Sequence, residues 1–341
     1  MGYAEFQNQF LNQLAKYENT KSKIPLFKRA LDKAVKNELP LRDCEQRFQI
    51  RDIFHSANLR ISYNSTNLMC KYSEEKKSLF VGTLAPAWSR GWRTISKDSY
   101  VSELIGDLFF CMNQYVYRGY QVNLLGAIAL TYGRPCDFRG YEFSDYALPF
   151  CIENYNSFRN NIPILESKRN HIFTYYVELI NGLDPYVNRV IHYYIRALSL
   201  LKDGYDEEAI TAADNAIDII IQAIKLNRHM PTKSRSDMYG IMREDINLPS
   251  GTLDQLENLY LIRCRFSAHP AQTKWWDFSE IYDCDIEKIM YAVKLTIVRF
   301  LQYEEKNRKI EKYPLCWSKW FMDNCDKVFD AVWFHRLPIL R

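Results

Sequence analysis

The 341-residue sequence lacks several patterns that would assign it to a functional class at once. Between residues 61 and 165 there is no glycine-rich phosphate loop, no G-x-S-x-G motif, no H-E-x-x-H motif and no pair of spaced aspartates. These absences argue against a P-loop nucleotidase, a serine hydrolase or a zinc protease in this half. We therefore interpret residues 1–165 as an accessory or sensing domain whose ligand the sequence does not name.

Paired cysteines are also missing. None of the nine cysteines belongs to a C-x-x-C pair, and their number is odd, which argues against both a zinc knuckle and a disulfide framework. Reduced, mostly buried thiols are the expected state, as in a cytoplasmic protein. We expect no metal and no cofactor.

Long apolar runs are absent as well. No stretch of 18 apolar residues exists, and the densest run, Leu124–Leu130, is too short to span a bilayer. The start, MGYAEFQNQF, has no basic segment followed by an apolar run, so it does not resemble a secretory signal. The sequence predicts a cytoplasmic protein without a membrane partner.

The charge balance excludes a globally basic nucleic-acid binder. The 45 Lys and Arg residues against 41 Asp and Glu leave a net charge of +4, so any nucleic-acid site must be local. The aromatic share of 15% predicts large packed interiors, although some rings could also stack on unpaired bases.

The apolar periodicity predicts a mainly α fold. We expect helices over the first 60 residues, a small β-hairpin from LMCKYS and SLFVGTL, and a helix over Tyr100–Tyr117. Strong helical patterns follow over 167–181, 184–204, 206–227, 253 to about 268, and 283–306. The expected organisation is an N-terminal domain (1–165), an antiparallel helical bundle (166–310) and an aromatic helical extension (311–341).

The run LIRCRFSAHP contains Arg263 and His269, which together carry chemistry suited to RNA cleavage. Attack by a ribose 2′-hydroxyl needs a group that moves protons near neutral pH, and histidine does this. It also needs a permanent cation on the phosphate, which the planar guanidinium provides. These two residues are the predicted catalytic pair.

The end of this predicted helix favours such a site. Pro270 disfavours helical geometry at His269, so the helix should end near Ala268 or His269, where the helix dipole favours a protonated imidazole. Arg265 lies one turn before His269 and is a candidate second phosphate ligand.

Two acids on the preceding helix are candidate partners for Arg263. Asp214 and Asp218 lie one turn apart, and either could fix the orientation of the arginine, because a partly buried charge needs a counter-charge. The alternative for either residue is an exposed acid without such a role.

In their order and spacing, several segments resemble the HEPN (higher eukaryotes and prokaryotes nucleotide-binding) superfamily over roughly residues 184–307. These segments are YYIRALSLLKDGYDEEAITAADNAIDIIIQAI, LENLYLIRCRFSAHP and DIEKIMYAVKLTIVRFLQY. The resemblance places Arg263 and His269 at the positions of the family's R-x(4–6)-H motif. It also favours Asp218 over Asp214 as the partner of Arg263, because Asp218 follows the AADNAI run, where the family's acidic residue tends to fall. Cys264 departs from the family pattern, since active members often have Asn, Asp or His after the arginine.

The resemblance implies a homodimeric, metal-independent endoribonuclease that leaves a 2′,3′-cyclic phosphate, with two motifs facing each other across the dimer. A role as a toxin or antiphage defence effector, regulated by a protein such as an antitoxin, is implied by resemblance alone. The alternative is a catalytically silent module for dimerisation, RNA binding or partner binding, which Cys264 and the small net charge favour. The helical partner of a nucleotidyltransferase antitoxin fits less well, because Ala271 stands where some such partners carry a modified tyrosine.

Three further features of the sequence each allow two interpretations. The basic stretch with Arg228, Lys233 and Arg235 either contacts RNA or is a solvated loop. Trp275 and Trp276 either stack on a base or pack in a core or dimer interface. The aromatic face of the C-terminal extension must be buried, either on its own chain or against a second subunit.

Overall fold

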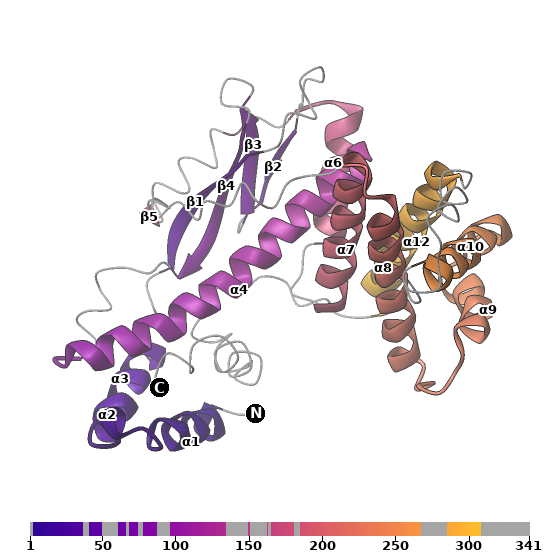
Figure 1. Ribbon diagram of the computed structural model, residues 1–341. Coiled ribbons are helices and arrows are strands. Elements are labelled where there is room, and N and C mark those ends of the chain that lie inside the picture. The colour runs from indigo at the N-terminus through magenta and orange to yellow at the C-terminus, as the bar shows by residue number, and fades with distance from the viewer. Residues whose placement is uncertain are drawn as a thin grey trace.

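The computed structural model confirms a mainly α fold (Figure 1). It describes residues 3–36, 41–49, 61–65, 68–73, 78–86, 96–133, 149–150, 162, 165–180, 185–266 and 285–307. His269, Trp275, Trp276 and the extension 311–341 lie outside these residues.

The long helix α4 (Ser99–Tyr132) connects the two ends of the molecule in Figure 1. Asp98 caps its start by accepting a hydrogen bond from the Val101 amide at 3.1 Å. Its end is set by Gly133, which adopts a left-handed φ of 65° that a residue with a side chain adopts rarely.

The predicted helix over Tyr100–Tyr117 was therefore too short. The structure continues through Gly119 to Tyr132, because one glycine weakens a helix by only about 1 kcal/mol and does not end it. The apolar run Leu124–Leu130 lies in this extension, and all of its side chains are buried. Among the described residues, no helix combines the length and the apolar character that crossing a membrane requires.

Three short helices pack at the N-terminal end of α4: α1 (Tyr3–Leu14), α2 (Glu18–Lys21) and α3 (Ile24–Lys36). The apolar face of α3 points inward, and the buried Phe27 meets the Tyr100 ring edge-on at a centroid distance of 6.3 Å. Lys23 adds an ion pair of 2.9 Å to Asp98, which ties these helices to the cap of α4.

A five-stranded antiparallel sheet lies beside α4. Its strands occur in the order β2-β3-β4-β1-β5. Their bounds are β1 (Leu41–Gln49), β2 (Ser62–Asn64), β3 (Leu68–Ser73), β4 (Ser78–Pro86) and β5 (Pro149–Phe150). The predicted hairpin is confirmed as β3–β4, in which Ser73 pairs with Ser78.

The prediction of helices throughout the first 60 residues is wrong at 41–49. This segment, LRDCEQRFQ, forms β1 and pairs with β4 along its full length, from Leu41 opposite Pro86 to Gln49 opposite Ser78. It has no clear alternation of apolar and polar residues, so the strand follows from pairing with a distant partner rather than from its own pattern.

The C-terminal half is a bundle of helices (Figure 1). The predictions for α6 (Lys168–Ile180), α7 (Pro185–Lys202), α8 (Asp206–Asn227), α10 (Ser250–Phe266) and α12 (Ile286–Asn307) are confirmed within a few residues. One helix was not predicted: α9 (Arg235–Asp245) begins inside the stretch treated as a polar loop.

The buried side chains form one continuous cluster, with members on both sides of the predicted boundary at 165 and 166. Asn170 on α6 joins the sheet to the bundle: its Oδ1 accepts from the Ser62 amide at 2.8 Å, and its Nδ2 donates to the Leu165 carbonyl at 3.0 Å. Gly126 allows α4 to approach α7, because a β-carbon at this position would clash with Ile191.

Candidate functional site

The site begins on α8, where an alanine- and isoleucine-rich face is buried against its neighbours. Two acids, Asp214 and Asp218, lie one turn apart on this helix. The Asp214 side chain is fully buried, whereas that of Asp218 is 41% exposed. A buried carboxylate is tolerated only when cations and hydrogen-bond donors compensate for its lost hydration, so the surroundings of Asp214 must provide both.

Arg235 provides the first cation, and it is placed by the start of α9. Ser234 caps this helix in a capping box: its hydroxyl accepts from the Asp237 amide at 3.2 Å, and the Asp237 carboxylate accepts from the Ser234 amide at 3.2 Å. Arg235 is the first residue of the helix, and its guanidinium forms ion pairs with both Asp214 and Asp218.

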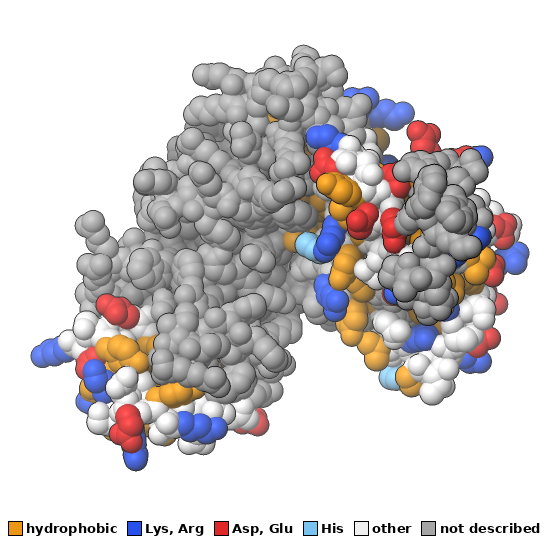
Figure 2. Space-filling view, viewed as in Figure 1, with side chains coloured by type: hydrophobic (Ala, Val, Ile, Leu, Met, Phe, Trp, Pro, Cys, Tyr) orange, Lys and Arg blue, Asp and Glu red, His pale blue; other side chains and the backbone are white. Residues whose placement is uncertain are grey.

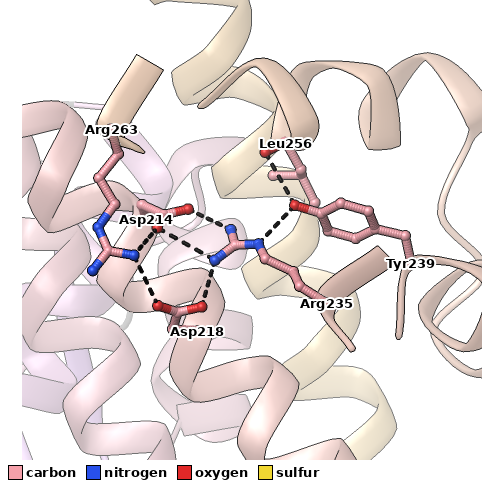
Figure 3. Close-up of polar contacts among 6 residues, drawn as sticks. All are labelled: Asp214, Asp218, Arg235, Tyr239, Leu256 and Arg263. Carbon is pink, nitrogen blue, oxygen red and sulfur yellow. Dashed lines mark hydrogen bonds and ion pairs between the residues drawn. The ribbon is translucent and has the colours of Figure 1, made fainter. Parts of the chain in front are cut away.

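Two tyrosines hold the Arg235 guanidinium from its remaining sides. Arg235 Nε donates to the Tyr239 hydroxyl at 2.8 Å, and that hydroxyl donates in turn to the Leu256 carbonyl at 3.2 Å (Figure 3). The Tyr260 ring lies 4.3 Å from the guanidinium carbon, a cation–π distance. Arg235 therefore links α8, α9 and α10, and its side chain is only 12% exposed.

Arg263 on α10 reaches the same acids. Its Nη1 lies 3.0 Å from Asp214 Oδ2 and 3.4 Å from Asp218 Oδ2. Figure 3 shows the two carboxylates between the Arg263 and Arg235 guanidiniums. Among the described residues, none accepts a hydrogen bond from Arg263 Nε or Nη2, and the side chain is 30% exposed. Within the part of the chain that the structure describes, the two acids hold Nη1 and leave Nε and Nη2 without an acceptor.

Burial and charge oppose each other in this cluster of Asp214, Asp218, Arg235 and Arg263, which we call the carboxylate–arginine cluster. Burial raises the pKa of Asp214, and Arg235 and Arg263 act against that rise. Burial disfavours the charged form of Arg235, but Asp214, Tyr239 and Asp218 outweigh it and raise the pKa of the guanidinium. With two acids and two arginines ionised, the formal charge of the cluster is zero.

Cys264, the departure from the family pattern, is partly buried beside the cluster. The nearby Cys264 thiol is the main cause of the raised pKa of the Tyr260 hydroxyl. Cys264 therefore influences the tyrosine whose ring covers Arg235.

The predicted pairing of Arg263 with an α8 acid is confirmed, and both candidates take part. The preference for Asp218 needs a correction, because Asp214 is the closer partner and the buried one. Arg265 is exposed, and its guanidinium carbon lies 5.6 Å from the Phe266 ring. His269 lies outside the described residues, and so does the predicted end of its helix near Ala268.

The predicted basic loop divides into three different environments. Arg228 is half-exposed and paired with Asp245, with Nε 2.9 Å from Oδ2. Lys233 is exposed. Arg235 is neither a solvated loop residue nor a surface contact for RNA, because its guanidinium is enclosed by acids and aromatic rings. The S-x-x-D spacing of Ser234 and Asp237 is typical of a helix start, so the sequence could have predicted that α9 begins here.

The surrounding surface carries both signs of charge. Figure 2 shows acidic and basic side chains interspersed over the described part of the bundle on this face, without one continuous basic patch. Within the described residues, no group of three His, Cys, Asp or Glu side chains is arranged to bind a metal ion.

No protein-family model matches the chain, and comparisons with curated proteins and with solved structures found no similar protein. The resemblance to the HEPN superfamily therefore stays a prediction from the sequence.

Proposed function

We propose that the protein is a metal-independent endoribonuclease of the HEPN type that acts as a homodimer. In this reaction the ribose 2′-hydroxyl of the substrate attacks the adjacent phosphorus, the 5′-oxygen leaves, and a 2′,3′-cyclic phosphate remains. His269 would move the proton at the reacting oxygens, and Arg263 would bind the phosphate and stabilise its developing charge.

The observation that carries this proposal is the arrangement of Arg263. A carboxylate pair fixes its Nη1, while Nε and Nη2 have no acceptor among the described residues. An arginine held along one edge is pre-organised to bind a phosphate along another, which lowers the entropy cost of binding. His269 follows six residues later in the chain.

The zero charge of the carboxylate–arginine cluster supports a dimeric site. Asp218 is partly exposed, so an approaching phosphate meets a carboxylate as well as a guanidinium. Additional positive charge is needed, and a second copy would provide another Arg263 together with Arg265 and a protonated His269. A cytoplasmic toxin or antiphage effector, with residues 1–165 as its regulatory part and an antitoxin as its partner, is the corresponding biological role.

A catalytically silent module for dimerisation or for binding RNA or a partner is the second candidate. Two observations favour it: Cys264 occupies the position where active members often carry a polar group, and it lies near enough to Tyr260 to raise the pKa of that hydroxyl. In this reading, the carboxylate–arginine cluster serves only to hold α8, α9 and α10 together.

The test is incubation of mixed RNA with the purified full chain in EDTA. Arg263→Ala and His269→Ala are compared with matched controls, Arg196→Ala on the exposed face of α7 and His171→Ala, whose side chain is 65% exposed. The nuclease proposal expects cutting by the unchanged protein and both controls, and loss of cutting in the two site variants with dimerisation intact. Intact RNA with every protein favours the silent module.

A further inference from the structure

The hydrogen bonds of Arg235 use all three of its guanidinium nitrogens. Nε donates to Tyr239, Nη2 to Asp214 Oδ1, and Nη1 to Asp218 Oδ1 and, at 3.3 Å, to Asp214 Oδ2. Four of its five N–H groups are thus bonded to protein, and the side chain is only 12% exposed. Arg235 can therefore act on a substrate only through other residues.

The four carboxylate oxygens are shared unequally between the two arginines. Arg235 contacts three of them: both oxygens of Asp214 and Oδ1 of Asp218. Arg263 contacts Oδ2 of each acid through a single nitrogen, Nη1. The contacts that a carboxylate would otherwise make with a second nitrogen of Arg263 are thus already made by Arg235.

We propose that Arg235 is a positioning residue that occupies the carboxylate pair, so that Arg263 keeps Nε and Nη2 for a phosphate. This inference rests on the proposed function for the identity of the ligand, an RNA phosphate. Its structural part, that Arg235 controls the availability of Arg263, stands on the contacts alone.

The charge of the carboxylate–arginine cluster explains why Arg263 needs Arg235 beside it. Without Arg235, two carboxylates would face one guanidinium, and the local formal charge would fall from zero to −1. Arg263 would then be drawn into a two-nitrogen pairing with the acids, the preferred geometry of arginine and carboxylate. The phosphate would lose its donors and also meet a net negative charge.

The surroundings of Arg235 fit a guanidinium and do not fit the ammonium group of a lysine. Tyr239 accepts from Nε, and the Tyr260 ring covers the planar face of the group at 4.3 Å. A lysine has one nitrogen and no planar face, so it would keep the charge but could not span both acids and Tyr239.

The experiment measures binding of a non-cleavable 2′-O-methyl oligoribonucleotide. Arg235→Gln should weaken binding about tenfold or more, the effect of losing a charge-assisted hydrogen bond. Adding Asp218→Asn restores the formal charge to zero, so the double variant should regain most of the affinity. Arg243→Gln, an exposed arginine on the same helix, is the control for the loss of one positive charge.

A purely structural role predicts the opposite for the double variant, because a second lost contact adds to the first. Equal binding by the unchanged protein and a folded Arg235→Gln variant, or no recovery in the double variant, overturns the proposal. Circular dichroism is used to check that each variant is folded. If Arg235→Gln does not fold, Arg235→Lys and Tyr239→Phe replace it, with the same direction and a smaller effect.

A second readout does not require RNA. Phenylglyoxal modifies accessible guanidiniums, and peptide mass spectrometry reports the rate at each arginine. Arg263 should react in the unchanged protein, severalfold more slowly in Arg235→Gln, and again readily in the double variant. An unchanged rate in Arg235→Gln overturns the positioning role. If the predicted labelling pattern occurs without any RNA binding or cutting, the positioning role holds and the nuclease function is refuted.

Discussion

Arg263 and Asp214 form an ion pair of 3.0 Å in which the carboxylate is fully buried and the arginine side chain is 30% exposed. The pair therefore joins the core of the bundle to its surface. An anion that binds the outer part of Arg263 meets a group whose position the core determines.

Removing the charge of Asp214 should destabilise the fold more than removing that of Asp218. Asp214→Asn leaves Arg235 and Arg263 with weaker acceptors in a buried setting, and we expect a loss of about 2–3 kcal/mol in the free energy of unfolding. Asp218→Asn, at a half-exposed site, should cost about 0.5–1 kcal/mol. Urea denaturation measures both. Equal losses would show that the burial of Asp214 does not increase its contribution to the free energy of unfolding.

Gly126→Ala should destabilise the contact between α4 and α7. The added β-carbon would clash with the branched side chain of Ile191, and overpacking of this kind costs about 1–3 kcal/mol. Gly240→Ala on α9 is the matched control, because nothing lies within 4 Å of its added carbon; there the helix should gain about 0.5–1 kcal/mol. Thermal unfolding should move the two melting temperatures in opposite directions, and a shift of the same sign would contradict the packing of α4 on α7.

The cap of α4 should lose its effect in acid. The hydrogen bond from Lys23, followed by that from the Val101 amide, lowers the pKa of Asp98 below its ordinary value of 3.8. A carboxyl whose pKa is lower in the folded state stabilises the fold fully above its unfolded value, and this contribution disappears as the pH falls through the folded value. The gap in urea midpoint between the unchanged protein and Asp98→Asn should be widest at neutral pH and close below pH 3.8. A gap that is constant with pH would show that Asp98 does not stabilise α4 through its charge.

Arg263→Lys separates charge from geometry at the proposed phosphate site. Lysine keeps the positive charge and can still reach Asp214, so the fold should persist. The planar fork is lost, and we expect the rate of RNA cleavage to fall about 10²-fold. Single-turnover kinetics measure this, with Arg196→Lys as the control. Full activity of Arg263→Lys would mean that Arg263 acts only as a point charge.

The helices of the bundle were predictable because their apolar spacing agrees with their final environment. Asp206–Asn227 was predicted with the bounds that α8 has, and its alanine and isoleucine stripe is buried. The strand β1 was not predictable in the same way, since its partners β4 and β5 lie far along the chain and its own residues carry little strand pattern. The local spacing of apolar residues indicates which face of a helix is buried, whereas the order of strands depends on pairing between distant segments.

The candidate site was predictable in part. The arginine and its two acids could be paired from their places on neighbouring helices, and the structure confirms that pairing. The role of Arg235 was missed, because a cation in a polar stretch has the same sequence pattern whether it is solvated or enclosed. Its enclosure depends on Tyr239 and Tyr260, which α9 and α10 bring together only in three dimensions.

The most direct test of the nuclease proposal is the chemistry of the cleaved ends. A ribo-oligonucleotide cut by the protein in EDTA is analysed by mass spectrometry, beside the same oligonucleotide with a 2′-O-methyl group at the cleaved position. The proposal predicts a 2′,3′-cyclic phosphate on the 5′ fragment, a free 5′-hydroxyl on the 3′ fragment, and no cutting at the methylated position. A 5′-phosphate on the 3′ fragment, or cutting at the methylated position, would contradict attack by the substrate's own 2′-hydroxyl.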